Sequence, residues 1–375
     1  KSWNWRNTQL NGSTNLLSIA CLCPNLESII FNGLMHPINT DQWDKFAKCI
    51  GAKLINCNFN RIHNNSILTI FFKRFQNIEK IAFGTQYKEE DKELFGYLKA
   101  CNNLKSLKWR NLRYYQAAAI QEHKRIKHVV ERVNELEIDL GYFIKLKPNV
   151  NNLTQLILSS SFQNSYSQMT GTFDSLTYLK CINFRHEEFE SFTDLKFPNL
   201  KACSLDKCMG MNPSFIRSIS TIKSITFKRT SFDVVAPVIC SLRNIIHFQF
   251  LKGNLRDQTG AEILNQLLVE LSKHKSIRKI KIDFRNDNRN NASIEGTFKK
   301  IVDLAKEKPD VDLKIVFPNH QSLGVVNLYK VKFAEMKRAS RYLTNIRIEN
   351  LASPYQYNYL LHNHDDDDDE ADDIF

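Results

Sequence analysis

The sequence contains little glycine and little proline. Only 12 Gly and 9 Pro occur among the 375 residues, and no stretch rich in either residue divides the chain as a flexible linker would. No apolar run approaches the length of a membrane span, and no signal-peptide core is visible. We therefore expect one continuous domain that does not enter a membrane. The sequence begins at Lys1 rather than at a methionine, which leaves open a signal segment or a further domain upstream.

The motifs of the common catalytic sites are also missing. There is no glycine-rich phosphate loop, no G-x-S-x-G elbow and no helical metal-binding motif. Scattered His, Cys and Asp residues in repeated sequences more often fill cores and surfaces than form catalytic triads. We expect that the protein is not an enzyme, has no catalytic residue and needs no cofactor.

What the sequence does contain is one short pattern, first met in residues 23–31. Apolar side chains stand at Leu26, Ile29 and Phe31, a spacing written L-x-x-L-x-L. The last two alternate with polar neighbours, as residues of a half-buried strand do, and Leu26 marks an inward turn before that strand.

The same spacing recurs along nearly the whole chain. Thirteen copies can be counted, of which one, between Pro309 and Phe317, is degenerate because it has one residue too many. The other twelve begin at Leu26, Leu54, Ile78, Leu104, Val133, Leu153, Leu176, Leu200, Ile222, Ile245, Ile277 and Leu343. Successive copies from Leu26 to Ile245 start 20 to 29 residues apart, and the next step is 32 residues.

This period and pattern resemble leucine-rich repeats, whose length is about 20–29 residues. The resemblance implies an α/β leucine-rich repeat solenoid, or horseshoe, with a parallel sheet on the concave side and helices or irregular segments on the convex side. One repeat cannot bury its own apolar face, so neighbouring repeats must stack to share a core. We predict a repeat domain over residues 1–350, with helices over 41–47, 89–100, 116–130 and 257–273, and with the fuller helices toward the C-terminus.

The nine cysteines are an odd number and most of them fit the pattern. Cys57, Cys181 and Cys203 occupy apolar positions, and Cys23 and Cys101 each stand three residues before a first leucine. Free cysteines used in this way as small apolar residues are typical of a reducing compartment. A zinc site would need a second pair of ligands, which the sequence does not provide, so we expect no metal.

Charge divides the chain into a basic body and an acidic tail. The chain has 52 basic and 40 acidic residues, and eight of the acidic ones lie in residues 365–373. The body therefore carries 52 basic against 32 acidic residues, a net charge of +20. The tail has almost no apolar content, and we predict that residues 351–375 are disordered.

Many basic residues occupy strand positions that point away from the core. We predict that these residues form a partner-binding surface on the concave face, because a face with one sign of charge attracts partners of the opposite sign. The candidates are Lys105, Lys108, Arg110, Lys180, Lys201, Lys207, Lys223, Lys228, Arg229, Lys252, Arg278, Lys279 and Lys281. Acidic residues in the same positions are few, namely Asp206, Asp283 and a cluster of Glu135, Glu137 and Asp139.

Three features of the repeats resemble those of F-box leucine-rich proteins. The spacing is irregular, Phe is frequent in the third apolar position, and two repeats start with Cys23-Pro24-Asn25-Leu26 and Cys101-Asn102-Asn103-Leu104. In that eukaryotic family the repeats bind the substrate of a cullin-type ubiquitin ligase. An F-box before the repeats holds a Skp-type adaptor, which this protein would bind if an F-box precedes Lys1. No F-box is visible before Leu26, although residues 1–5 are compatible with the end of one.

Two other functions stay open. The Ran GTPase-activating type also joins such repeats to an acidic tail, but its repeats carry a regular Asn after the strand, and here that position varies. Nucleic acid would suit the basic face, but exposed aromatic residues for base stacking are not apparent. We predict a monomeric interaction module of the cytoplasm, the nucleus or both, whose protein partner presents an acidic or phosphorylated segment.

Overall fold

A computed structural model of the chain describes residues 2–6, 25–32, 40–50, 53–59, 65–83, 92–109, 126–160, 167–230, 232–251, 260–283, 294–317 and 346–350. The chain forms two compact units, Lys1–Ile245 and Ile246–Phe375. The boundary at residue 350 and the predicted disorder of the tail stay predictions, because residues 351–375 lie outside the described ranges.

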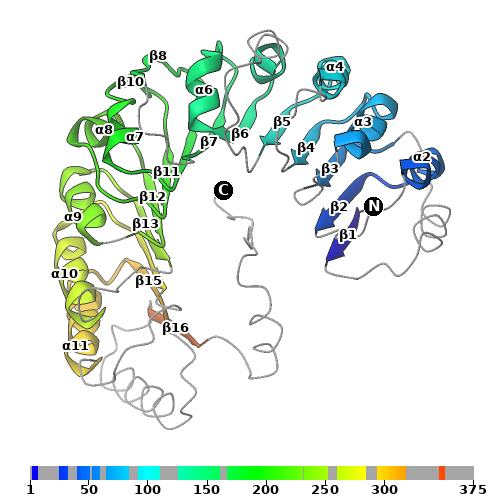
Figure 1. The fold of residues 1–375 in the computed structure, drawn as a ribbon. Coiled ribbons are helices and arrows are strands. Elements are labelled where there is room, and N and C mark those ends of the chain that lie inside the picture. The colour runs from blue at the N-terminus through cyan, green and yellow to red at the C-terminus, as the bar shows by residue number, and fades with distance from the viewer. Residues whose placement is uncertain are drawn as a thin grey trace. The chain divides into compact units, whose positions relative to one another are not determined.

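The first unit is built on parallel strands that pair in chain order (Figure 1). The strands of this sheet are β1 (Ser2–Arg6), β2 (Ser28–Asn32), β3 (Asn56–Phe59), β4 (Lys80–Phe83), β5 (Ser106–Trp109), β6 (Glu135–Asp139), β7 (Gln155–Ser159), β9 (Tyr178–Ile182), β11 (Ala202–Asp206) and β12 (Ser224–Lys228). Strand β1 was not predicted from the sequence. A separate two-stranded parallel sheet pairs β8 (Thr170–Thr172) with β10 (Asp194–Lys196).

The second unit repeats the arrangement with β13 (His247–Leu251), β14 (Lys279–Asp283), β15 (Asp312–Phe317) and β16 (Ile346–Asn350), again parallel and paired in order. Strand β15 comes from the degenerate copy. The buried residues of this copy are Val311, Leu313, Ile315 and Val316. Leu313 and Ile315 are the register partners of Ile280 and Ile282 on β14, so this copy has one residue between its first two apolar positions where the others have two.

Helices return the chain between the strands, and in each unit they lie on one side of the sheet (Figure 1). The first unit has α2 (Thr40–Cys49), α3 (Asn65–Arg74), α4 (Lys92–Ala100), α6 (Leu140–Leu146), α7 (His186–Glu190), α8 (Pro213–Ser218) and α9 (Phe232–Ser241). The second has α10 (Gly260–Lys273) and α11 (Ile294–Glu307). These two helices are 14 residues long, which confirms the prediction of fuller helices toward the C-terminus.

The register explains why the pattern specifies the fold. Its second apolar positions are partners of one another across the first unit, in the order Ile29, Cys57, Ile81, Leu107, Leu136, Leu156, Leu179, Cys203 and Ile225. None of these side chains is more than 2% exposed. Burying a leucine or isoleucine stabilises a fold by about 1.5–3 kcal/mol, so a shared row of them holds the stack together. Each unit is a leucine-rich repeat solenoid.

Aromatic side chains fill the space between the strands and the helices. In the first unit the ring of Phe59 on β3 lies 5.0 Å from that of Phe71 on α3, which in turn lies 5.6 Å from Trp43 on α2. Edge-on contacts of this kind add to the stabilisation that burial gives. No described helix combines the length and the apolar content needed to cross a bilayer.

Candidate partner-binding surface

The described helices of the first unit lie on one side of its sheet (Figure 1), and we call the other side of the sheet the strand face. Side chains reach it from the strand positions between the buried pattern residues, because successive side chains of a strand point to opposite sides. Three neighbouring strands place nine residues there, three from each strand, aligned by the register of β9 with β11 and of β11 with β12. They are Tyr178, Lys180, Ile182, Ala202, Ser204, Asp206, Ser224, Thr226 and Lys228.

The structure divides the predicted basic residues into groups. Lys108, Lys180 and Lys228 lie on the strand face of the first unit, and Lys279 and Lys281 lie on the corresponding face of β14 in the second unit. Four exposed residues directly precede strands, namely Lys105 before β5, Lys201 before β11, Lys223 before β12 and Arg278 before β14. Lys207 and Arg229 directly follow β11 and β12. Arg110 and Lys252 lie outside the described ranges.

The residues after β9, β11 and β12 share an uncommon backbone conformation. Asn183, Lys207 and Arg229 have φ angles of 58°, 53° and 51°, in the left-handed region that residues other than glycine rarely adopt. The N–H of Asn183 donates to the carbonyl of Asp206, and the N–H of Lys207 donates to that of Lys228, at 2.9 and 2.8 Å. These bonds join neighbouring repeats and offset the conformational strain.

The left-handed turn brings Arg229 onto Asp206 of the preceding strand. The Nε of Arg229 donates to Oδ1 of Asp206 at 2.9 Å and its Nη2 donates to Oδ2 at 2.8 Å, which is a bidentate pair. Asp206 is only 2% exposed, and Lys228 lies 4.0 Å from the same carboxylate. The guanidinium of Arg229 therefore serves the fold, and the negative charge of Asp206 is compensated where it stands.

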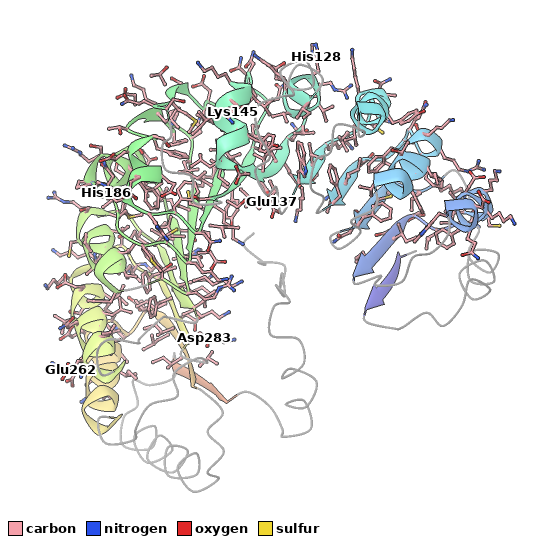
Figure 2. All side chains as sticks on the ribbon, viewed as in Figure 1. His128, Glu137, Lys145, His186, Glu262 and Asp283 are labelled. Atoms are coloured by element: carbon pink, nitrogen blue, oxygen red, sulfur yellow. The ribbon has the colours of Figure 1, made fainter. Side chains whose placement is uncertain are left out.

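The positive charge of the first unit is concentrated at β9, β11 and β12. Residues 177–183, 201–207 and 223–229 contain six basic residues and one acidic residue, Asp206, so their net charge is +5. Toward β5 and β6 the balance changes. Lys105 pairs with Glu79 at 2.9 Å, and Glu135 and Glu137 stand on β6, where Figure 2 shows Glu137 on the side away from the helices. Asp139, also on β6, caps α6 by accepting from the N–H of Gly141.

The strands of the second unit carry more negative charge among their lysines than we predicted from the sequence. Lys281 on β14 and Lys314 on β15 are register partners, but Asp312 is the partner of Lys279, and Asp283 ends β14 with no exposed surface. Lys314, like Lys80 on β4 of the first unit, was missed among the candidate residues. Both occupy the strand positions from which the other lysines were chosen, so the same reasoning could have found them.

Sequence reasoning also missed an apolar part of the strand face. Tyr178 and Ile182 stand on either side of Lys180 on β9, and Ile157 on β7 is the register partner of Lys180. All three apolar side chains are half-buried. Their sequence signal was an apolar residue in a position where the pattern expects a polar one. Such a cluster beside charged residues is typical of the centre of a protein–protein interface.

The buried cysteines are structural. Burial raises the pKa of Cys101 to about 11 and that of Cys208 to about 12, so both thiols stay protonated at neutral pH. The Sγ of Cys208 lies 3.4 Å from the carbonyl of Cys181, to which it donates, and the hydroxyl of Thr230, one repeat further on, donates to that of Leu205 at 3.0 Å. No group of three metal-ligating side chains is found in the part of the chain that the structure describes.

Comparison with known proteins gives no match to a family model and none to a curated protein. Among solved structures, the yeast Rad7–Elc1 complex has 14% sequence identity and a TM-score of 0.43, over 75% of this chain and 68% of that one. An internalin of Listeria monocytogenes has 9% identity and a TM-score of 0.37, over 91% of this chain and 94% of that one. Likenesses at this level carry no information on function, which has to be argued from the surface itself.

Proposed function

We propose that the protein is an interaction module that binds an acidic segment of a partner protein on the strand face of β7, β9, β11 and β12. The observation that carries the proposal is the net charge of +5 on three adjacent strands and the residues directly before and after them, beside the apolar residues Ile157, Tyr178 and Ile182. The lysines would attract the segment and orient it, and the apolar residues would supply most of the binding free energy.

The proposal is tested by reversing the charge of two lysines that form no ion pair with another described residue. Lys180 lies on the strand face and Lys223 is exposed at the start of β12. The double variant Lys180→Glu/Lys223→Glu should bind a fluorescent acidic peptide with a central leucine at least about tenfold more weakly, a loss of about 1.4 kcal/mol. Fluorescence anisotropy at 50 and 150 mM salt measures the affinity.

The matched control is Lys73→Glu/Lys196→Glu, which makes the same change in net charge on α3 and β10, away from the strand face. It should keep the parent affinity at 150 mM salt, where charges more than about 8 Å apart are largely screened. Equal losses in both variants would contradict the proposed surface. Tighter binding of a single-stranded oligonucleotide, with affinity falling steeply as salt rises, would favour nucleic acid instead.

We further propose that the partner is a substrate of a ubiquitin ligase, so that the chain acts as the substrate-recognition or adaptor subunit. This finer proposal is supported by the resemblance of the Cys-Pro-Asn-Leu and Cys-Asn-Asn-Leu repeat starts to those of F-box leucine-rich proteins. We expect the natural full-length protein to bind a purified Skp-type adaptor in gel filtration. A folded full-length protein that elutes separately from the adaptor would contradict it and leave the acidic-segment proposal intact.

A further inference from the structure

On β11 and β12 the strand face of the first unit carries four small residues with little exposed surface. Ala202, Ser204, Ser224 and Thr226 point to the solvent side of the sheet, yet they are only 5%, 4%, 7% and 5% exposed. They are small residues among larger ones, because Tyr178 and Lys180 stand on the neighbouring strand and Asp206 and Lys228 end the two strands. We call these four small residues the floor.

The floor offers three hydroxyl groups with hydrogen-bonding capacity to spare. Ser204 and Thr226 are register partners on adjacent strands, and Ser224 is two residues before Thr226. Within the described ranges, the buried side-chain polar atoms without a partner are those of Trp43, Trp109 and Asn265. The three hydroxyls are not among them, and no hydrogen bond joins any of the three to another described residue. A buried hydroxyl of this kind can donate to a ligand.

Positive charge surrounds the floor. Lys180 is the register partner of Ser204, and Lys201 and Lys223 directly precede Ala202 and Ser224. The one acidic residue at its border, Asp206, is held by both guanidinium contacts of Arg229. The next acidic residues on this face, on β6, lie two strands beyond Lys180, which is about 10 Å at the usual strand spacing.

We propose that the floor binds the phosphate of a phosphorylated serine or threonine in the partner's segment. Such a phosphate carries a charge of about −1.5 to −2 and three acceptor oxygens, which matches three hydroxyl donors with lysines around them. A carboxylate has one charge and two oxygens, and it makes less use of the same groups. The inference rests on the proposed function and makes it specific, because it distinguishes a phosphorylated segment from a merely acidic one.

Three peptides of one acidic sequence, with Ser, Glu or phosphoserine at the central position, test the inference on the full chain. We expect the phosphoserine peptide to bind at least about tenfold tighter than the Glu peptide. The variant Ser204→Ala/Thr226→Val removes two hydroxyls and keeps the lysines, so it should reduce this preference to about twofold, because it weakens the phosphoserine peptide more than the Glu peptide. The control variant Thr172→Val/Ser220→Ala, which changes two exposed hydroxyls elsewhere, should keep the full preference.

The outcomes separate the two proposals. Equal binding of the Glu and phosphoserine peptides overturns the phosphate site and leaves the acidic-segment function standing, whereas no binding of either peptide overturns both. A preference for phosphoserine that survives in Ser204→Ala/Thr226→Val places the phosphate elsewhere and overturns the site. An oligonucleotide and the Glu peptide can also be compared as competitors of the phosphoserine peptide. If the oligonucleotide displaces the phosphoserine peptide at a lower concentration than the Glu peptide does, the floor binds phosphodiesters, and the proposed phosphoserine site is overturned.

A second measurement covers the case in which the double variant does not fold. In the parent protein with labelled methyl groups, the methyl signals of Thr226 and Ile182 should shift on addition of the phosphoserine peptide. The methyl signal of Thr172, on the separate β8–β10 sheet, should stay in place. If the peptide binds and the methyl signal of Thr226 stays in place, the proposed phosphate site is overturned, and this result needs no variant.

Discussion

Replacement of Leu156 by aspartate is expected to unfold the repeats around β7. Leu156 has no exposed surface, and its register partners are the buried Leu136 and Leu179. The substitution removes a leucine side chain, which costs about 2–5 kcal/mol, and leaves an unpaired charge between stacked repeats. In a repeat protein each repeat contacts only its neighbours, so we expect unfolding to begin locally and not throughout the chain. Limited proteolysis with mass-spectrometric mapping should find new cleavage sites between residues 126 and 200.

The next residue supplies the control. Ile157 is half-buried on the strand face, so Ile157→Asp introduces the same charge into the same strand on the side that meets solvent. It should leave the protease resistance near that of the parent, although it is expected to weaken partner binding. If Leu156→Asp and Ile157→Asp were equally resistant, the assignment of the buried and exposed sides of β7 would be wrong.

This contrast between neighbours also shows why the fold could be predicted from the sequence. Alternation along a strand is a local property, and a repeat shows it many times, so Leu156, Leu179 and Ile225 could be assigned to the core without any knowledge of their contacts. The prediction failed where a copy of the repeat pattern was incomplete or had a shorter spacing. Strand β1 has no repeat start before it in the sequence, and the copy at Val311 has a shorter spacing.

The strand face could be predicted only in part, because its properties depend on contacts between repeats. The strand positions of Lys180 and Lys228 follow from the pattern. The pairing of Arg229 with Asp206 does not, since it joins residues 23 positions apart and needs the left-handed backbone at Arg229. The floor gave no signal either, because Ser and Thr are ordinary residues in exposed strand positions. Only their low exposure, which the neighbouring strands create, distinguishes them.

The Asp206–Arg229 pair is expected to be one of the larger electrostatic contributions to stability in the described part of the first unit. Removing one partner of a buried, bidentate pair costs about 3–5 kcal/mol, because the other charge is left without compensation. The two single variants should differ. Asp206 is 2% exposed and its side chain cannot turn to solvent, whereas the side chain of Arg229 is 25% exposed. We therefore expect Arg229→Ala to destabilise the protein more than Asp206→Ala does.

A double-mutant cycle tests this expectation. In urea unfolding, Asp206→Ala/Arg229→Ala should be less destabilised than the sum of the single variants, by a coupling energy of about 2 kcal/mol. The matched cycle on Glu79 and Lys105 concerns a pair of similar length, 2.9 Å, whose side chains are 35% and 60% exposed. Exposed pairs of this kind contribute about 0.2–1 kcal/mol. If the two cycles gave the same coupling energy, burial would not be what strengthens the Asp206–Arg229 pair. In that case Arg229 would be as available to a partner as the exposed lysines are.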